Sequence, residues 1–254
     1  MKQINKYIVE RLRINKDTGN HRNRHYNYHP TSRTELRQLV YKLIKERGNN
    51  ADLNDIDTSE ITTMVELFYN YEFNGDISNW NVSNVTDMSA IFCESKFTGE
   101  NGDISNWDVS NVENMNYMFA YSSFNGNISN WDVSNVKEMV SMFEESKFNG
   151  DISNWNVSKV INMNSMFANS EFNGDISEWN VSNVKDMDNM FRLSKFNGDI
   201  SKWNVSNVEK MYSMFRTSKF NGDISNWDVS NVKDMHAMFI SSPLEKNPPK
   251  WYKK

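Results

Sequence analysis

Apolar residues recur along this chain with one dominant period. Tryptophan falls every 24 residues from Trp107 to Trp251, and 27 residues separate Trp80 from Trp107. One complete unit, FNGDISNWNVSNVTDMSAIFCESK, spans residues 73–96. A fixed period of 20–50 residues is typical of repeat architectures, in which no single unit buries its apolar face alone. The sequence therefore predicts a stack of units that share one core.

The apolar positions inside a unit suggest two kinds of element. Ile77, Trp80 and Val82 follow the Asn74-Gly75 turn signal, and the spacing of two between Trp80 and Val82 is strand spacing. Residues 85–92 then place Val, Met, Ile and Phe at i, i+3, i+6 and i+7, which favours a short helix or 3₁₀ turn. Each unit is thus expected to form a short strand, a corner and a short helical segment.

Changes in the repeat predict the domain organisation. Seven regular units follow a degenerate one, so a solenoid is expected over residues 49–242. Three additional residues within 97–107 should form a longer loop without shifting the register. Residues 243–254 form a truncated unit in which Pro248 and Pro249 would prevent completion of a last strand.

A helix is predicted over about residues 33–47, ahead of the repeats. Ser32 and Glu35 form a capping-box pattern, and Gly48 is a suitable C-terminal stop. This helix should cover the open end of the repeat core, as a terminal cap does. Its apolar stripe consists of Leu36, Leu39, Val40, Leu43 and Ile44.

The unit resembles the leucine-rich repeats of the BspA-like family. The resemblance rests on GDISNWDVSNVKDMHAMF (residues 222–239) and on ADLNDIDTSEITTM (residues 51–64), where the array begins. It implies an α/β repeat solenoid with a short parallel strand and a short helix or 3₁₀ turn per unit. It also implies surface proteins that bind host or matrix proteins and other cells, which would place the chain at a cell surface.

Charge is distributed unevenly. Residues 1–48 hold twelve Lys/Arg against four Asp/Glu, a net of +8, whereas residues 49–254 hold sixteen against twenty-nine, a net of −13. The basic segment could dock on the acidic body. Alternatively, Arg22, Arg24, Tyr26 and their neighbours could bind nucleic acid, since cations neutralise phosphates and aromatic rings stack on bases.

The predicted strands place polar residues on a concave face, where solenoids bind partners. The hypothesis is a polar, mildly acidic groove for a protein or a glycan; the alternative is a hydrogen-bonded ladder that only rigidifies the stack. The first series comprises Asn81, Asp108, Asp132, Asn156, Asn180, Asn204 and Asp228. The second comprises Asn106, Asn130, Asn154, Glu178 and Lys202.

A convex or lateral interface competes with this groove, because the segment predicted to be helical carries more varied side chains. Varied side chains with aromatic anchors are typical of protein interfaces. The residues concerned are Glu94, Tyr117, Tyr121, Glu144, Arg192, Arg216, Tyr212 and His236.

The sequence indicates neither an enzyme nor a cofactor. It holds no catalytic motif, and its one cysteine, Cys93, excludes a disulfide framework. His21, His25 and His29 are spaced by four, but the following Pro30 argues against a helix that would align them for a metal. The Asn-Gly-Asp turns match calcium-binding repeats poorly.

Targeting features are also missing from the sequence. It predicts no signal peptide, no anchor and no membrane span. A cytoplasmic interaction protein, or a structural component of a phage or virus particle, would fit these features.

Overall fold

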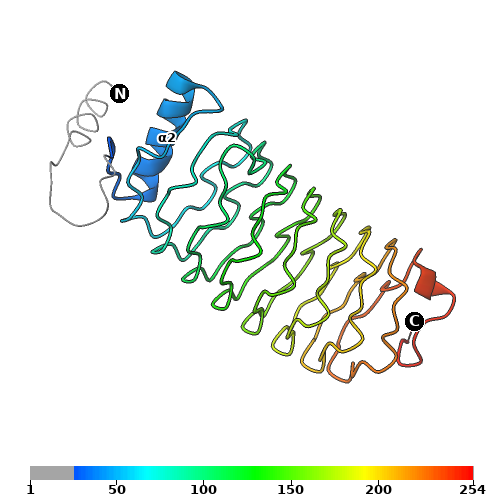
Figure 1. The fold of residues 1–254 in the computed structure, drawn as a ribbon. Coiled ribbons are helices and arrows are strands. Elements are labelled where there is room, and N and C mark those ends of the chain that lie inside the picture. The colour runs from blue at the N-terminus through cyan, green and yellow to red at the C-terminus, as the bar shows by residue number, and fades with distance from the viewer. Residues whose placement is uncertain (1–25, 254) are drawn as a thin grey trace.

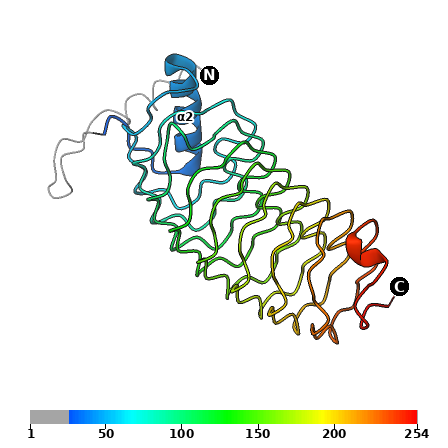
Figure 2. The ribbon, with the colours of Figure 1, turned by 45° about the vertical axis from the view of Figure 1, so that its right-hand side comes forward.

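The repeat units are stacked between two short helical elements. The structure is a computed structural model that describes residues 26–253. Helix α2 (Arg33–Arg47) lies at one end of the stack, and the 3₁₀ helix η1 (Pro243–Glu245) lies at the other (Figure 1). Successive units lie side by side along one axis in both ribbon views (Figures 1 and 2).

Neighbouring units pair through isolated parallel bridges. Between residues 26 and 253, no strand longer than a single bridge is formed. Apart from the bridge between Tyr28 and Ile56, each bridge joins equivalent positions of adjacent units, so the sequence period sets the register. The residues bridged in succession are Thr63, Asp87, Asn114, Glu138, Asn162, Asp186, Lys210 and Asp234.

The backbone around and after each bridge forms what we call the ladder segment, residues 86–94 in the first regular unit. Its N–H groups alternate between two kinds of acceptor. Met88 donates to the carbonyl of Asn114 in the next unit (3.0 Å), and Phe92 donates to that of Met118 (3.1 Å). Ile91, between them, donates back to Met88 within its own unit (3.2 Å). The ladder segment is therefore a series of tight turns linked to the next unit.

The sequence favours a short helix or a 3₁₀ turn over residues 85–92, and the structure has consecutive turns with no continuous helix there. A helix would direct its N–H groups to carbonyls three or four residues back in the same unit, whereas here alternate groups bond to a neighbour. Ala90 (φ 53°) and Glu94 (φ 57°) also adopt the left-handed region, which an α-helix does not contain. Consecutive turns reproduce the i, i+3 apolar spacing because each turn advances the chain by a similar number of residues.

The strand predicted over residues 77–82 is replaced by turns. The N–H of Trp80 bonds to the carbonyl three residues back (3.1 Å), and that of Val85 does the same (2.9 Å). Asp76 accepts the backbone N–H of Ser78 through Oδ1 (2.9 Å). Such local bonds compete with extended backbone, so the polar residues between the apolar ones decide the conformation.

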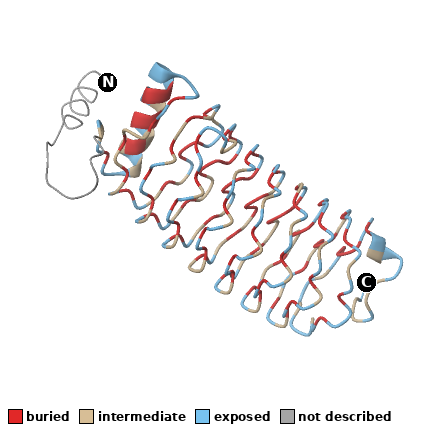
Figure 3. Ribbon diagram, in the orientation of Figure 1, coloured by how far each residue is buried: buried red, intermediate tan, exposed pale blue. Residues whose placement is uncertain are grey.

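The apolar side chains form one continuous core, as the sequence predicts. Phe143 stacks on Phe167 of the next unit with ring centroids 5.7 Å apart. Trp155 is buried and donates from Nε1 to the carbonyl of Ile128 (3.1 Å). Figure 3 shows buried residues recurring in each loop of the stack.

The three-residue insertion leaves the register intact. Trp107 bonds to the carbonyl of Ile77, 30 residues earlier (3.2 Å), where Trp131 bonds to Ile104, 27 residues earlier (3.0 Å). The same contact is thus preserved across the longer loop.

Helix α2 packs on the first unit through the stripe expected from the sequence. The side chain of Ser32 accepts the N–H of Glu35 (3.3 Å), and Gly48 ends the helix with φ 92°. Arg33 donates from Nε to the carbonyl of Val65 in the first ladder segment (2.6 Å). The buried residues of the helix are Leu36, Leu39, Val40, Leu43 and Ile44.

Part of the basic segment docks on acidic residues of the degenerate unit. Arg47 forms two bonds to the carboxylate of Asp55, both 2.9 Å, and Asn27 donates a third at 2.9 Å. Burial opposes ionisation of Asp55, but these hydrogen bonds outweigh it and lower its pKa. His29 Nδ1 lies 3.2 Å from Asp57. The other candidates in this segment, His21, His25, Arg22 and Arg24, lie outside the described residues.

The truncated C-terminal unit continues the tryptophan contacts. Trp251 donates from Nε1 to the carbonyl of Ile224 (2.9 Å) and stacks on Trp227 at 6.4 Å. Pro248 and Pro249 lie in the loop that leads to Trp251 and offer no backbone N–H.

Candidate functional site: the ladder face

The polar side chains form two surfaces of different character. The turn face consists of residues 76–84 and their equivalents in the other units. The ladder face consists of the exposed side chains of the ladder segments, which are residues 62–70, 86–94, 113–121, 137–145, 161–169, 185–193, 209–217 and 233–241.

The first series of predicted site residues lies on the turn face, in turns rather than on a strand. Each side chain is exposed and accepts the backbone N–H of the serine two residues later. Asp132 does so for Ser134 at 3.0 Å, and the bonds from the Ser134 hydroxyl and N–H lower the pKa of Asp132. The same contact occurs at Asn81, Asp108, Asn156, Asn180, Asn204 and Asp228.

The second predicted series is also exposed on the turn face. Glu178 and Lys202 form an ion pair between adjacent units at 3.0 Å, with each side chain more than 70% exposed. An ion pair in that environment stabilises little. Asn106, Asn130 and Asn154 are the other members.

A further asparagine ladder stabilises the turn face. Asn111 donates from Nδ2 to the carbonyl of Ser83 (2.7 Å), and Asn207 makes the equivalent bond to Ser182 (2.7 Å). These bonds, repeated with nearly unchanged residues, give the uniform turn face a direct structural role. These bonds support the alternative that the polar residues of the turn face rigidify the stack.

The ladder face differs because its residues vary from unit to unit. The position of Glu94 is occupied in later units by Tyr121, Glu145, Asn169 and Leu193. The exposed large apolar side chains of the described chain all lie on this face: Tyr69, Tyr117, Tyr121, Ile161, Leu193 and Ile240. The eight varied residues that the sequence singles out as a competing interface are all on it too.

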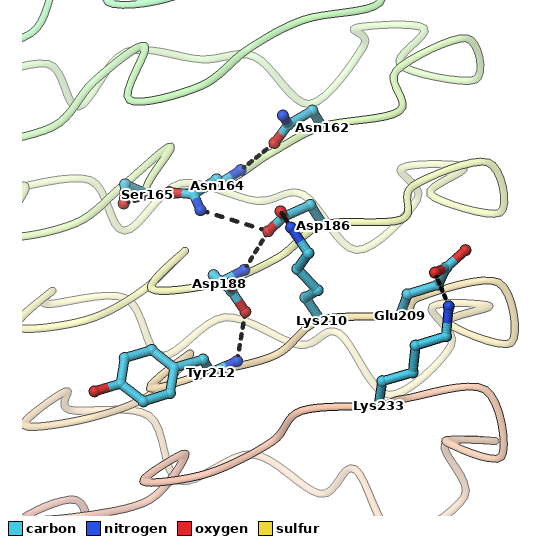
Figure 4. Close-up of polar contacts among 9 residues, drawn as sticks. All are labelled: Asn162, Asn164, Ser165, Asp186, Asp188, Glu209, Lys210, Tyr212 and Lys233. Atoms are coloured by element: carbon cyan, nitrogen blue, oxygen red, sulfur yellow. Dashed lines mark hydrogen bonds and ion pairs between the residues drawn. The ribbon is translucent and has the colours of Figure 1, made fainter.

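Polar contacts run along the ladder face between units (Figure 4). Asp186 Oδ2 lies 2.9 Å from Lys210 Nζ, and Asp186 Oδ1 accepts the N–H of Asp188 at 3.0 Å. Asp188 in turn accepts the N–H of Tyr212 at 2.6 Å. Glu209 and Lys233 form a second ion pair nearby. These bonds fix the orientation of side chains that differ in each unit.

Burial and neighbouring charge perturb the carboxylates of this network. Burial raises the pKa of Asp188, and the charges of Asp186 and Asp234 add to it, despite the opposing bond from Tyr212 and the charge of Lys210. Burial likewise raises the pKa of Glu138. The charge of Asp186 therefore contributes to the raised pKa of both groups.

The N-terminal half of the ladder face combines aromatic rings with carboxylates. Tyr69 donates its hydroxyl to Glu94 Oε1 at 3.0 Å. Burial, together with the charge of Glu144 and its hydrogen bond, raises the pKa of Tyr121 to about 12. Cys93 is buried beneath, and burial raises the pKa of its thiol to about 11, with Glu94 and Glu144 contributing.

One known family model matches nearly the whole repeat array. The model of a family described as "Mycoplasma protein of unknown function, DUF285" matches residues 34–147, 93–194 and 144–251. The chain belongs to the DUF285 family. The three matches overlap because the DUF285 pattern spans several units and fits the array in more than one register. No curated protein and no solved structure matches the chain.

Across the part of this DUF285 chain that the structure describes, no helix is long and apolar enough to cross a membrane.

Proposed function

We propose that this protein is a non-catalytic protein–protein interaction module that binds its partner through the ladder face. The observation that carries the proposal is the contrast between the two faces. The turn face repeats nearly the same hydrogen-bonded residues in every unit, whereas the ladder face varies at exposed positions. A stack needs uniform contacts to hold together, but a specific interface needs different side chains at different places.

The side chains of the ladder face suit a protein partner. Tyrosine and arginine are enriched in the residues that dominate binding energy, and this face presents Tyr117, Tyr121, Arg192 and Arg216. Backbone bonds to the neighbouring units hold these residues on a rigid support, so little order has to be gained on binding.

The finer assignment is that the units are leucine-rich repeats of the BspA-like type. It rests on the resemblance of residues 222–239, and it would give the module a role in adhesion or surface recognition. Such modules act without a cofactor, and this reading assigns no catalytic residue. A glycan would be a less suitable ligand for the ladder face, because its exposed residues include charged pairs such as Lys233 and Glu209.

The test compares two triple variants of the full chain as baits in lysate of the source cells. One removes ladder-face anchors: Tyr117→Ser, Tyr121→Ser and Leu193→Ser. The other places charge on the turn face: Asp132→Lys, Asn156→Lys and Asn180→Lys. We expect the turn-face variant to capture the same protein as the parent and the ladder-face variant to lose it. The reverse result would overturn the proposal in favour of the turn face.

A further inference from the structure

At the last two positions of each ladder segment, which are equivalent to Cys93 and Glu94, the charge changes sign along the stack. At these positions the acidic half of the ladder face carries Glu94, Glu144 and Glu145, and the basic half carries Arg192 and Arg216. The carboxylates of the basic half, such as Asp186 and Glu209, lie earlier in their segments. The change occurs at the unit of Ala168 and Asn169, whose side chains are uncharged. Glu144 and Arg192 occupy the same position of the repeat as Ala168, one unit before it and one unit after it.

Other charged side chains of the ladder face pair with an opposite charge in the adjacent unit, but these do not. Lys137 pairs with Glu113 at 2.8 Å, and Lys210 pairs with Asp186 at 2.9 Å, in each case one unit apart. Glu144 and Arg192 are two units apart, which separates their backbones by about 10 Å.

Within residues 26–253, the two arginines of the basic half, Arg192 and Arg216, form no ion pair. Glu145 forms none there either, and the partner of Glu144 is the hydroxyl of Tyr121.

A two-fold rotation through the central unit makes this surface complementary to itself. In two antiparallel copies, the unit of Glu144 in one copy faces the unit of Arg192 in the other. The unit of Tyr121 faces that of Arg216, which suits a cation–π contact. Each pairing occurs twice because a two-fold interface is isologous. Ala168 at the centre is buried in its own chain, so no side chain protrudes into the contact from this position.

We infer that the partner of the ladder face is a second copy of this chain, bound antiparallel about the unit of Ala168. The inference rests on the proposed function, since it requires the ladder face to be an interaction surface. Seven of the eight ladder segments have a counterpart across this axis, because residues 62–70 face no segment of the other copy. At about 4.8 Å each, the seven extend roughly 34 Å. A strip about 24 Å wide would then provide the about 800 Å² per partner that a stable interface needs.

Sedimentation velocity of the full chain, at micromolar concentration and low salt, tests this inference. Four samples are compared with the parent: Glu144→Arg, Arg192→Glu, their equimolar mixture, and the chain carrying both substitutions. Each single variant places like charges opposite one another. The mixture and the double variant restore opposite charges at both symmetric contacts.

We expect the parent to sediment as a dimer, and each single variant to have a dimer dissociation constant higher by about tenfold or more. The mixture and the double variant should recover dimerisation. Lys202→Glu, a charge reversal on the turn face, should leave the dimer unchanged. Circular dichroism establishes that every variant is folded.

A parent that sediments as a monomer, or single variants that dimerise as tightly as the parent, would overturn the inference. The comparison of baits, which tests the proposed function, is independent of this sedimentation experiment. If the parent is monomeric and the ladder-face variant fails to capture the protein that the parent captures, only the inference of a second copy is contradicted. The proposed function would then stand.

Discussion

The indole Nε1 of Trp155 donates to the backbone carbonyl of Ile128, 27 residues earlier (3.1 Å). Both residues are almost completely buried. The bond therefore joins adjacent units inside the core, where an unpaired carbonyl would have no water to replace the donor. The same relationship recurs from Trp80 to Trp251. It couples stacking of the rings to pairing of the backbone.

Trp155→Phe should lower the free energy of unfolding by about 1–3 kcal/mol, because the Ile128 carbonyl loses its donor. Trp155→Ala should cost about 3–5 kcal/mol and could split unfolding into two transitions, since coupling is between nearest neighbours. Urea denaturation followed by circular dichroism measures both. The control is Trp251→Phe at the half-buried end of the array, which should cost less. A Trp155→Phe variant as stable as the parent would show that the indole bond contributes nothing.

Leu193→Gly should stabilise the protein by about 0.5–1 kcal/mol. Leu193 is 40% exposed and has φ 60°, a conformation that costs a leucine energy and glycine almost none. The loss of chain entropy offsets part of that gain. Ile161→Gly is the matched control, because Ile161 is equally exposed and lacks a positive φ. That substitution should destabilise the protein. Thermal melting measures both variants, and melting temperatures that shift in the same direction for the two would disagree with the structure.

Asp188→Asn should raise the melting temperature at pH 7. The pKa of Asp188 is raised in the folded state, chiefly by burial, so ionisation of Asp188 destabilises the fold. That penalty is absent below the unfolded pKa of about 3.9 and grows as the pH rises through the folded value. Asparagine keeps an acceptor for the N–H of Tyr212. The gain should therefore shrink as the melts are repeated towards pH 3.

Asp132→Asn should behave in the opposite way and serves as the comparison for Asp188. Bonds from Ser134 lower the pKa of Asp132, so its ionised form stabilises the fold. That contribution is present above the unfolded pKa and is lost as the pH falls through the folded value. The variant should melt below the parent at pH 7 and approach it in acid. Equal pH profiles for the two variants would contradict these assignments.

Cys93 should react slowly with thiol reagents in the folded protein. Its side chain is 5% exposed, and burial raises the pKa of its thiol to about 11. At pH 8 the thiolate population is then on the order of 100-fold below that of an ordinary cysteine. Labelling with a chromogenic disulfide in buffer and in denaturant measures the ratio. Equal rates in the two conditions would show that the thiol is accessible.

The sequence predicts the longer-range features of this fold better than the conformation within a unit. The stripe of α2 and the Trp107 register across the insertion follow directly from apolar spacing. The interior of the unit does not, because spacing alone cannot separate a helix from consecutive turns that pair with a neighbour. Nor could it show that Asp76 would close a turn on Ser78 where a strand was expected.

The same limitation applies to the candidate site. Alternation along a strand is the basis for the predicted groove of Asn81, Asp132 and their equivalents, and these residues lie in turns instead. The variation at Tyr121 and Arg192 is visible in the sequence. Their position on one face becomes clear only when the ladder segments are seen to be linked by backbone bonds.

The face that meets the partner can be identified directly by site-specific photocrosslinking. Benzoylphenylalanine would replace Tyr121 on the ladder face in one sample and Asn130 on the turn face in another, each in the full chain with its partner present. We predict a crosslinked product from position 121 and none from position 130. Crosslinking from position 130 alone would contradict the account and return the binding site to the turn face.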